Sequence, residues 1–355
     1  MKIHAYCHTL ILGLYKYCHR QNISQYRYVF FRSYLPFIML KPMIAIVGGF
    51  CSASAYLLRN PTVLHKKKNL KFKCSHISHR GGAAENLENT MTAFQHAADL
   101  GTDMLEIDCH ITKDGIAVVS HDDLLERTTG QSLKISETNY CDLPLMQSPL
   151  DVTFCKGTSV EGCDKSVPKL VEVFDRFPST VVNIDIKIDN DKLIQEVSNL
   201  IIMYRREDIT VWGNFSNKIT SKCYKENPNV PLIIPFSQAL TILILYYTWL
   251  LPFYPIRESA FEMVMPKVFN DIGRKYFNSR PGRLFGNFLD YLIMNKKLIA
   301  HLNDRGIFTG LWVLNTEKDF QRAYDVGVQG VMTDYPTRLR RFLNDNPQYN
   351  KSSVE

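Results

Sequence analysis

The sequence predicts an α/β protein, a TIM-type (β/α)8 barrel with an N-terminal hydrophobic anchor. From Ile77 onward, short runs rich in β-branched residues alternate with helix-like stretches, which is typical of parallel α/β folds. About eight or nine such runs fall within roughly 260 residues, near the usual size of this barrel. An uncharged run, Pro42 to Leu58, lies ahead of them and is long enough to enter a bilayer.

Composition narrows the class of protein. Hydrophobic residues make up 45% of the 355 residues and charged residues 22%, which excludes a disordered chain. The net charge of +7 favours anionic surfaces, but the basic residues are scattered and form no nucleic-acid motif, so we expect no nucleic-acid partner. The nine cysteines include no C-x-x-C pair, which argues against a disulfide framework and a structural zinc site, and indicates a reducing compartment.

The N-terminal part divides into three segments. Residues 1–33 are an extension whose order the sequence does not define, 34–59 are a candidate transmembrane segment or membrane anchor, and 60–76 are a basic linker. The basic linker favours the cytosolic side for everything after it, whereas three arginines on the opposite flank weaken this preference. A cleaved signal peptide is the alternative, although the apolar run lies far from the N-terminus.

The predicted barrel covers residues 77–342, and residues 343–355 form a polar tail. We expect strands at 104–108, 116–121, 181–187, 209–212, 231–235, 308–314 and 330–334, with Glu262–Pro266 as a further candidate. Helices are expected at 88–100 and 296–305, and Gly101, Gly306 and Gly327 stand where helices should end.

A second apolar run, 239–253, lies inside the barrel region. Its hydropathy favours a membrane span, but a single crossing here would put strands of one barrel on opposite sides of the membrane. Pro252 and Pro255 also keep the run short. We therefore expect a helix that lies against the barrel or dips into one leaflet, with aromatic residues at the headgroup level: Tyr246, Tyr247, Trp249 and Tyr254. A wholly buried barrel helix is the alternative.

Polar residues with catalytic potential stand at the ends of predicted strands. His79 and Arg80 place a proton-transfer group beside a fixed positive charge, and the two glycines after them allow a ligand to approach closely. Glu106 and Asp108 are two residues apart on a strand, so they face the same side. Inside a barrel their charges would be costly without a cation, and carboxylates suit Mg²⁺ or Ca²⁺.

Two further pairs repeat this arrangement. Asp185 and Lys187 add a carboxylate and a cation on a later strand, and His121 with Asp122 ends another. Each residue alone is more often a solvent-facing or structural residue. Together they gather at strand ends, where barrel enzymes hold their catalytic residues.

The order and spacing of these motifs resemble the glycerophosphodiester phosphodiesterase domain family over about residues 77–342. The matching motifs are His79-Arg-Gly-Gly, Glu88-Asn-Thr, Glu106-Ile-Asp, Thr112-Lys-Asp-Gly, His121-Asp, Asp185-Ile-Lys, Trp312-Val-Leu-Asn and Thr333-Asp-Tyr-Pro. With its anchor and second apolar run, the chain resembles the membrane-linked animal subgroup that acts as lysophospholipase D.

The resemblance implies a role for each matching position. His79 and His121 would be the general acid and base, and Arg80 and Lys187 would bind phosphate oxygens. One divalent cation, Mg²⁺ or Ca²⁺, would be held by Glu106, Asp108 and Asp185. The substrate site would be lined by Glu88, Asn89 and Trp312. Asp185 departs from the many family members that carry Glu there, which makes its role the least defined of the three ligands.

The implied function is cleavage of the headgroup from lysophospholipids or of glycerophosphodiesters, at the endoplasmic reticulum or another intracellular membrane with the barrel facing the cytosol. The nucleophile is either the substrate's adjacent hydroxyl or a metal-bound water. Rival functions are a phosphodiesterase for phosphoinositide or sphingolipid headgroups and a catalytically silent lipid-binding protein. A transporter or channel subunit would need more spans than this chain offers.

Overall fold

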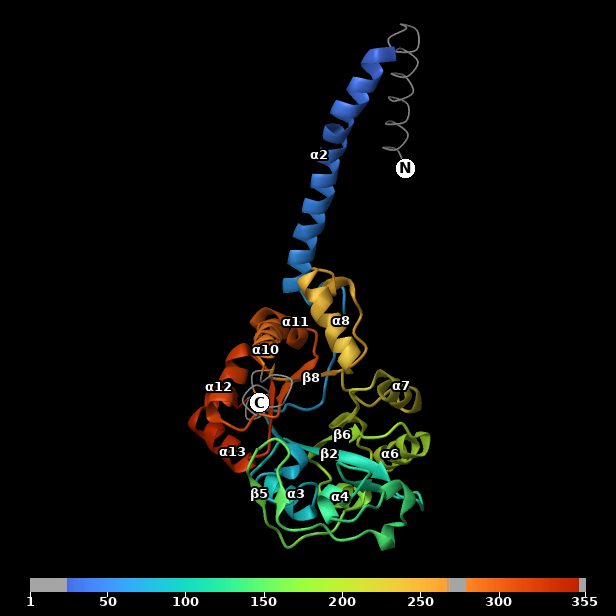
Figure 1. Ribbon diagram of the computed structural model, residues 1–355, viewed down its shortest axis with the longest axis vertical. Coiled ribbons are helices and arrows are strands. Elements are labelled where there is room, and N and C mark those ends of the chain that lie inside the picture. The colour runs from blue at the N-terminus through green and yellow to red at the C-terminus, as the bar shows by residue number, and fades with distance from the viewer. Residues whose placement is uncertain (1–23, 267, 269–278, 351–355) are drawn as a thin grey trace. The chain divides into compact units, whose positions relative to one another are not determined.

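The computed structural model describes residues 24–266, 268 and 279–350, and the chain divides into two units, Met1–Tyr56 and Leu57–Glu355. The helix α2, Ser24–Arg59, is the first described element (Figure 1). Its segment Pro42–Arg59 has a mean hydropathy of 1.3, and it is the one helix among the described residues that is long and apolar enough to cross a membrane. Part of the expected extension, residues 24–33, belongs to α2, whereas residues 1–23 lie outside the described chain.

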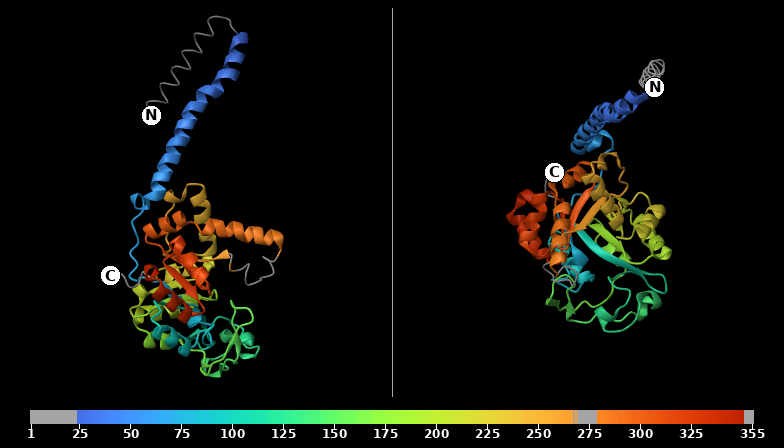
Figure 2. Two further views of the ribbon diagram at one scale, coloured as in Figure 1. Left: turned by 90° about the vertical axis from the view of Figure 1, so that its left-hand side faces the viewer. Right: turned by 45° about the horizontal axis from the view of Figure 1, so that its top comes forward.

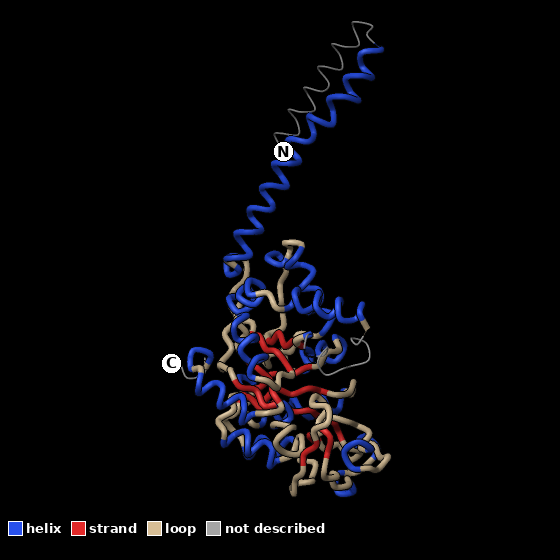
Figure 3. The backbone as a smooth tube through the Cα atoms, turned by 60° about the vertical axis from the view of Figure 1, so that its left-hand side comes forward, coloured by secondary structure: helices blue, strands red, loops and turns tan. Residues whose placement is uncertain are grey.

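The second unit is built on seven parallel strands, which Figure 3 shows in red among the helices. Their spatial order is β7-β6-β2-β1-β10-β9-β8. The strands are β1 His76–Ser78, β2 Met104–Ile111, β6 Val181–Ile186, β7 Thr210–Gly213, β8 Ala260–Val264, β9 Phe308–Trp312 and β10 Gly330–Thr333.

The gap between β7 and β8 is closed by the segment that contains Leu232 and Ile233. Leu232 forms a parallel bridge with Trp212 of β7, and Ile233 forms one with Ala260 of β8. The backbone N–H of Ile233 donates to the Trp212 carbonyl at 3.0 Å. The expected strand 231–235 therefore occupies the eighth position of the ring, where it forms single bridges in place of a full strand. The prediction of a TIM-type barrel is confirmed.

The predicted strand 116–121 is not a barrel strand. It forms β3, Ala117–Val119, which pairs antiparallel with the far end of β2. His121 therefore follows a hairpin that extends β2 beyond the ring, and it does not end a parallel strand as the alternating pattern predicted.

Helices surround the strands (Figures 1 and 2). They are α3 Met91–Asp99, α4 Glu126–Thr129, α5 Leu170–Arg176, α6 Asp191–Met203, α7 Asn217–Glu226, α8 Phe236–Tyr247, α10 Arg280–Ile293, α11 Lys296–Asp304, α12 Glu317–Val326 and α13 Pro336–Asp345. A short antiparallel pair, β4 Leu150–Asp151 and β5 Ser159–Val160, lies apart from the ring. The three glycines expected at helix ends have positive φ angles of 74°, 74° and 99°.

The first barrel helix begins later than its sequence predicts. The Thr90 side chain accepts a hydrogen bond from the Ala93 N–H at 3.2 Å, so Thr90 is the N-cap and α3 starts at Met91. Glu88 and Asn89 thus lie in the loop that leads into the helix.

Strand β2 shows how the barrel separates apolar from polar side chains. Leu105, Ile107 and Cys109 are buried in the core cluster that includes apolar residues of α3, α5 and α6. Since successive side chains on a strand point to opposite faces, Glu106 and Asp108 face the barrel interior instead. The same alternation puts Asn183 and Asp185 inside, next to them in register on β6.

The linker and the tail both pack on the barrel. The Lys68 N–H donates to the Arg305 carbonyl at 2.9 Å, so the linker of residues 60–76 is bound to the barrel at this point. At the other end α13 continues to Asp345, beyond the expected boundary at 342. Tyr349, in the short 3-10 helix η7, Pro347–Tyr349, stacks on Tyr324 with ring centroids 5.2 Å apart. Residues 351–355 lie outside the described chain.

The apolar run 239–253 forms α8 and the 3-10 helix η6, Leu251–Phe253. At 12 residues, α8 is too short to span a bilayer. One side of it, with Ala239, Ile242 and Leu243, is buried in the barrel's core, whereas Leu240 and Ile244 are 46% and 54% exposed. The alternative of a wholly buried helix is therefore wrong.

Candidate active site

A cavity of about 250 Å³ opens at the carboxyl ends of the barrel strands. All the site residues expected from the sequence line it except Glu88 and Asn89. The lining consists of His79, Arg80, Glu106, Asp108, His121, Phe154, Asn183, Asp185, Lys187, Asn214, Phe215, Ile233, Glu262, Trp312 and Met332.

The His-Arg-Gly-Gly turn after β1 brings the backbone close to two helices. A Cβ added to Gly81 would lie 2.7 Å from a ring carbon of Phe94 on α3, and one added to Gly82 would lie 2.6 Å from Pro336 on α13. Both glycines also have positive φ angles, 78° and 103°. Packing within the protein therefore requires glycine at both positions.

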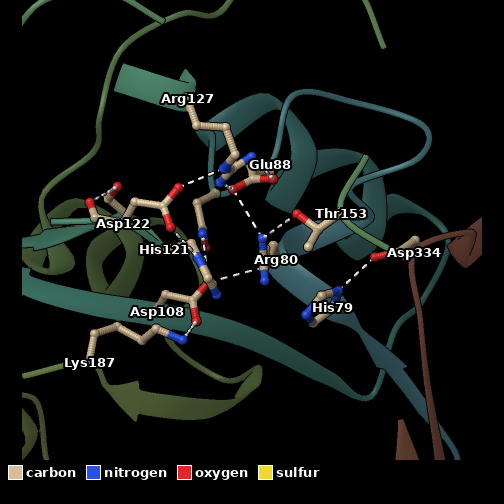
Figure 4. Close-up of polar contacts among 12 residues, drawn as sticks. His79, Arg80, Glu88, Asp108, His121, Asp122, Arg127, Thr153, Lys187 and Asp334 are labelled. Atoms are coloured by element: carbon tan, nitrogen blue, oxygen red, sulfur yellow. Dashed lines mark hydrogen bonds and ion pairs between the residues drawn. The ribbon is translucent and has the colours of Figure 1, made fainter. Parts of the chain in front are cut away.

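His79 is held by a carboxylate that sequence reasoning did not single out. Its Nδ1 lies 2.6 Å from Oδ1 of Asp334, which directly follows β10, and the other Asp334 oxygen accepts from the Asn315 amide at 2.9 Å (Figure 4). A carboxylate can only accept, so the proton lies on Nδ1 and Nε2 is left for the cavity. The available signal was the Thr333-Asp-Tyr-Pro motif, whose acidic residue stands at a strand end.

His121 repeats this arrangement on the β2–β3 side. Its Nδ1 lies 2.7 Å from Oδ1 of Asp122, whose other oxygen accepts from Nε of Arg127 at 2.6 Å. The His121 side chain is 28% exposed, whereas that of His79 is 7% exposed. Two imidazoles, each hydrogen-bonded to a carboxylate, thus line one cavity, an arrangement that suits a general acid–base pair.

Two cations neutralise the acidic residues in the cavity (Figure 4). The Lys187 ammonium lies 3.1 Å from Asp108 and 2.9 Å from Asp185, and Nε of Arg80 lies 3.3 Å from Asp108. Burial alone would raise the pKa of Asp108, but the charges of Lys187 and Arg80 outweigh it and hold that pKa well below its usual range. Asp185 also accepts from the Asn214 amide at 2.6 Å.

Glu106 is compensated only in part, because the charges of Arg80 and Lys187 do not outweigh its burial. Its carboxylate accepts from the backbone N–H of Arg80 at 2.8 Å, and the nearest ring nitrogen of His79 is 4.0 Å away. Burial, and next the charge of Asp108, raise the pKa of Glu106 well above its ordinary value. A cation beside this carboxylate would remove that penalty.

The carboxylates fit a divalent cation in their chemistry. Glu106, Asp108 and Asp185 offer only oxygen donors, as Mg²⁺ and Ca²⁺ prefer, and all three line the same cavity. Among the described residues no three His, Cys, Asp or Glu side chains are gathered into a metal cluster. The Lys187 ammonium pairs with both Asp108 and Asp185.

Glu88 and Asn89 lie behind the residues of the cavity. Glu88 accepts from Arg80 at 3.1 Å and from Arg127 at 2.6 Å, and the Asn89 amide donates to Asp108 at 2.9 Å. Burial opposes the ionisation of Glu88, but these two arginines lower its pKa overall. Neither residue of this pair lines the cavity, and both contact residues that do.

Three aromatic side chains from distant segments surround the cavity. The Trp312 ring lies 5.3 Å from that of Phe215 and 6.2 Å from that of Phe154, and Phe154 lies 5.5 Å from His79. Sequence reasoning found Trp312 and missed the two phenylalanines, because neither lies in a motif. Such an apolar wall around a few polar groups is typical of a small-molecule site.

Deeper in the barrel, Glu262 of β8 pairs with Asn183 of β6. The Asn183 amide donates to the two Glu262 oxygens at 2.9 and 2.8 Å. Burial raises the pKa of Glu262 to about 7. The sequence marked this stretch only as a possible strand.

Comparison with known proteins agrees with the geometry. Residues 79–232 match the glycerophosphoryl diester phosphodiesterase family. The chain is 50% identical to human "Lysophospholipase D GDPD1" over 303 residues, covering 85% of this chain and 96% of that protein. It is 37% identical to human "Lysophospholipase D GDPD3" over 309 residues, covering 87% and 97%.

Solved structures show the same fold. An Oleispira antarctica phosphodiesterase, solved in complex with the product sn-glycerol-3-phosphate, superposes with a TM-score of 0.54 at 18% identity, covering 77% of this chain and 97% of that one. A protein from Silicibacter pomeroyi described as a putative glycerophosphoryl diester phosphodiesterase gives 0.54 at 21% identity, covering 80% and 97%.

Proposed function

Because this chain belongs to the glycerophosphoryl diester phosphodiesterase family, we propose that it is a hydrolase that removes the headgroup from lysophospholipids as a lysophospholipase D, and that it also accepts glycerophosphodiesters. The observation that carries the proposal is the cavity itself. It holds two carboxylate-backed histidines, two cations and four acidic side chains within an aromatic wall. The identity to relatives named lysophospholipase D supports the choice of substrate.

The chemistry follows from these groups. A phosphodiester resists attack because its oxygens are anionic, so Arg80 and Lys187 would bind and neutralise them. Of His79 and His121, one would take a proton from the attacking hydroxyl at its Nε2 and the other would give a proton to the departing alkoxide. Asp334 and Asp122 would keep Nδ1 of each ring protonated and so hold Nε2 toward the substrate.

We further propose that Glu106, Asp108 and Asp185 hold one divalent cation, Mg²⁺ or Ca²⁺. When bound, it would supply a Lewis acid that stabilises charge on the phosphate oxygens. The buried and only partly compensated Glu106 carboxylate, on the same cavity as Asp108 and Asp185, supports this assignment. Glu88 and Asn89 would keep Arg80 and Asp108 in place, and Trp312 would pack against the glycerol part of the substrate.

The products would be lysophosphatidic acid and a free headgroup alcohol. The apolar helix segment Pro42–Arg59 would anchor the protein in the endoplasmic reticulum or another intracellular membrane, with the barrel facing the cytosol. That arrangement would bring the barrel to a membrane surface that supplies its substrate.

The test is to incubate the purified full-length protein with lysophosphatidylcholine, lysophosphatidylethanolamine and soluble glycerophosphocholine, and to identify the products by mass spectrometry. We expect lysophosphatidic acid from both lipids, loss of activity in chelator and its return with Mg²⁺ or Ca²⁺. Glu106→Ala and Asp108→Ala should be inactive, whereas Glu226→Ala, at an exposed carboxylate on α7, should be normal.

Two outcomes would count against separate parts of the proposal. Full activity in thorough chelator would contradict the cation. A higher kcat/KM for the soluble diester than for either lipid would contradict lysophospholipase D activity and leave a general glycerophosphodiesterase.

A further inference from the structure

Two neighbouring helices of the barrel unit expose large apolar side chains. On α8 and the loop after it they are Phe236, Leu240, Ile244, Tyr247, Trp249, Leu250 and Phe253, and on α10 they are Leu284, Phe285, Phe288 and Tyr291. We call this set the apolar face. The α10 members are 56–74% exposed, far more than such residues are in an ordinary packed helix.

The orientation of α10 is opposite to that of an ordinary surface helix. Arg280, Arg283 and Asn287 are exposed beside the apolar residues, but the one acidic residue of α10, Asp290, is buried and is bound by Arg322 of α12, with one N–O distance of 3.0 Å. Ile293, three residues on, is buried as well. These contacts turn Phe285 and Phe288 outward, where a water-facing helix would carry polar residues. The left view of Figure 2 shows α10, in orange, extending outward from the strands.

The two helices form one continuous surface. The Tyr247 hydroxyl at the end of α8 donates to the Leu292 carbonyl of α10 at 2.8 Å, and it accepts from the Asn295 amide at 3.1 Å. At its other end, α8 begins beside the cavity, because the Phe236 N–H donates to the carbonyl of Phe215, which lines the cavity. The apolar face therefore extends from the cavity mouth to the end of α10.

The last residues of α2 and the linker after them contact the barrel unit near this surface. The Leu58 carbonyl, one residue before the end of α2, accepts from Nδ1 of His301 on α11 at 2.9 Å. His65 bonds the Pro252 carbonyl within η6 at 2.8 Å. Exposed cations stand in the linker and at the starts of α10 and α11: Lys66, Lys67, Arg280, Arg283, Lys296 and Lys297. An apolar surface bordered by Lys and Arg is suited to the interface of an anionic leaflet.

We propose that the apolar face docks on the leaflet of the membrane that holds the chain, with Phe285, Phe288 and Trp249 among the lipid chains. A single anchor helix leaves the barrel free to turn, whereas this second contact would fix one orientation and place the cavity mouth near the lipid. The inference deepens the proposed function and rests on it for the choice of a membrane as the partner. It needs no catalytic activity to be tested.

The direct test uses tryptophan as a depth marker in the full-length protein. Phe288→Trp is reconstituted into phosphatidylcholine–phosphatidylserine vesicles with and without brominated acyl chains, and emission is compared with that of the unmodified protein. The matched control is Ile202→Trp on α6, which is 52% exposed and lies outside the apolar face. We expect Phe288→Trp to lose more than half of its added emission in brominated vesicles and Ile202→Trp to lose almost none.

Equal quenching of the two variants would overturn the proposal. So would an indole in Phe288→Trp that is shielded from both bromine and aqueous acrylamide, because that result would mark an interface with a second copy of the chain.

An activity measurement separates docking from catalysis. Phe285→Ser with Phe288→Ser should lower kcat/KM several-fold for vesicle-bound lysophospholipid and leave turnover of soluble glycerophosphocholine unchanged. The control Ile202→Ser with Met203→Ser, also at exposed apolar residues, should change neither. If the protein cleaved no lipid at all, the proposed function would fail while the quenching would still report docking.

Discussion

Arg80 interacts with three carboxylates of the site. It is 2% exposed, contacts Glu88 and Asp108, and donates its backbone N–H to Glu106. Burial alone would lower its pKa, but these carboxylates raise it, so the guanidinium is a permanent charge. Its φ of 51° is a conformation that costs a non-glycine residue about 1–3 kcal/mol and that the surrounding contacts must maintain.

The His79–Asp334 pair yields a prediction about proton transfer. Asp334→Asn would replace an acceptor with a group that can donate to Nδ1, and this would favour the wrong tautomer of His79. We expect kcat to fall by at least about 10²-fold, within the range of 10²–10⁴-fold expected for His79→Ala or His121→Ala. Turnover at saturating lysophosphatidylcholine, measured across pH, checks it, with Asp334→Glu as the variant that should recover activity.

Near-normal turnover in Asp334→Asn would show that the carboxylate has only a structural role. Near-normal turnover in either alanine variant would remove that histidine from the acid–base pair.

Glu262 yields a prediction about stability. Its pKa is about 7 in the folded protein against an ordinary value of 4.5. Between about pH 4.5 and pH 7 the Glu262 carboxyl is ionised in the unfolded chain but still protonated in the folded protein. The free energy of unfolding therefore falls as the pH rises through this range, and the fall is complete at about pH 7. By linkage this amounts to roughly 3 kcal/mol. Glu262→Gln can still accept from Asn183 but does not ionise.

The free energy of unfolding of Glu262→Gln should therefore decline less than that of the unmodified protein between pH 4.5 and 7. Chemical denaturation in a mild detergent at several pH values measures this, with Glu226→Gln as an exposed control. Parallel pH curves for the unmodified protein and Glu262→Gln would refute the prediction.

At the scale of elements, α8 has two faces of opposite environment. Leu243 is 5% exposed and packs in the core with residues of β8, β9 and α11, whereas its neighbour Ile244 is 54% exposed. Leu243→Ala should cost about 2–5 kcal/mol of unfolding free energy through the cavity it leaves. Ile244→Ala should cost less than about 0.5 kcal/mol.

Denaturation midpoints of these two variants in detergent check the assignment. Equal losses would mean that α8 is packed on both sides, and the apolar face would then be reduced to α10.

At the scale of the whole barrel unit, ring closure constrains the topology. β1 pairs with β10 and with β2, and the segment around Ile233 joins β7 to β8, so the strands before and after α8 must lie on one side of any membrane. Epitope tags inserted between residues 60 and 76 and after residue 350 should therefore be equally accessible in sealed microsomes, on the cytosolic side.

Protease protection of one tag but not the other would show that α8 crosses the membrane, and the barrel would have to be abandoned. Protection of both tags would keep the barrel and reverse the proposed orientation.

Much of the fold was predictable, because it depends on local patterns. The alternation of β-branched runs and helical stretches marked the ring strands. The glycines at 101, 306 and 327 marked helix ends, and the structure gives all three positive φ angles. The family motifs identified eight residues of the cavity lining, since each lies near a strand end. These features are local, so a single stretch of chain carries the whole signal.

The sequence by itself thus determined the barrel, the family and eight residues that line the cavity. Only the tertiary structure decided that Glu88 and Asn89 lie behind that cavity, that Asp334 holds His79 across 255 positions, and that α10 turns its apolar residues outward. The physical reason is common to all three. Ring closure brings together residues that are far apart in the sequence, and these neighbours set the direction of each side chain. No local sequence pattern shows which distant residues will meet.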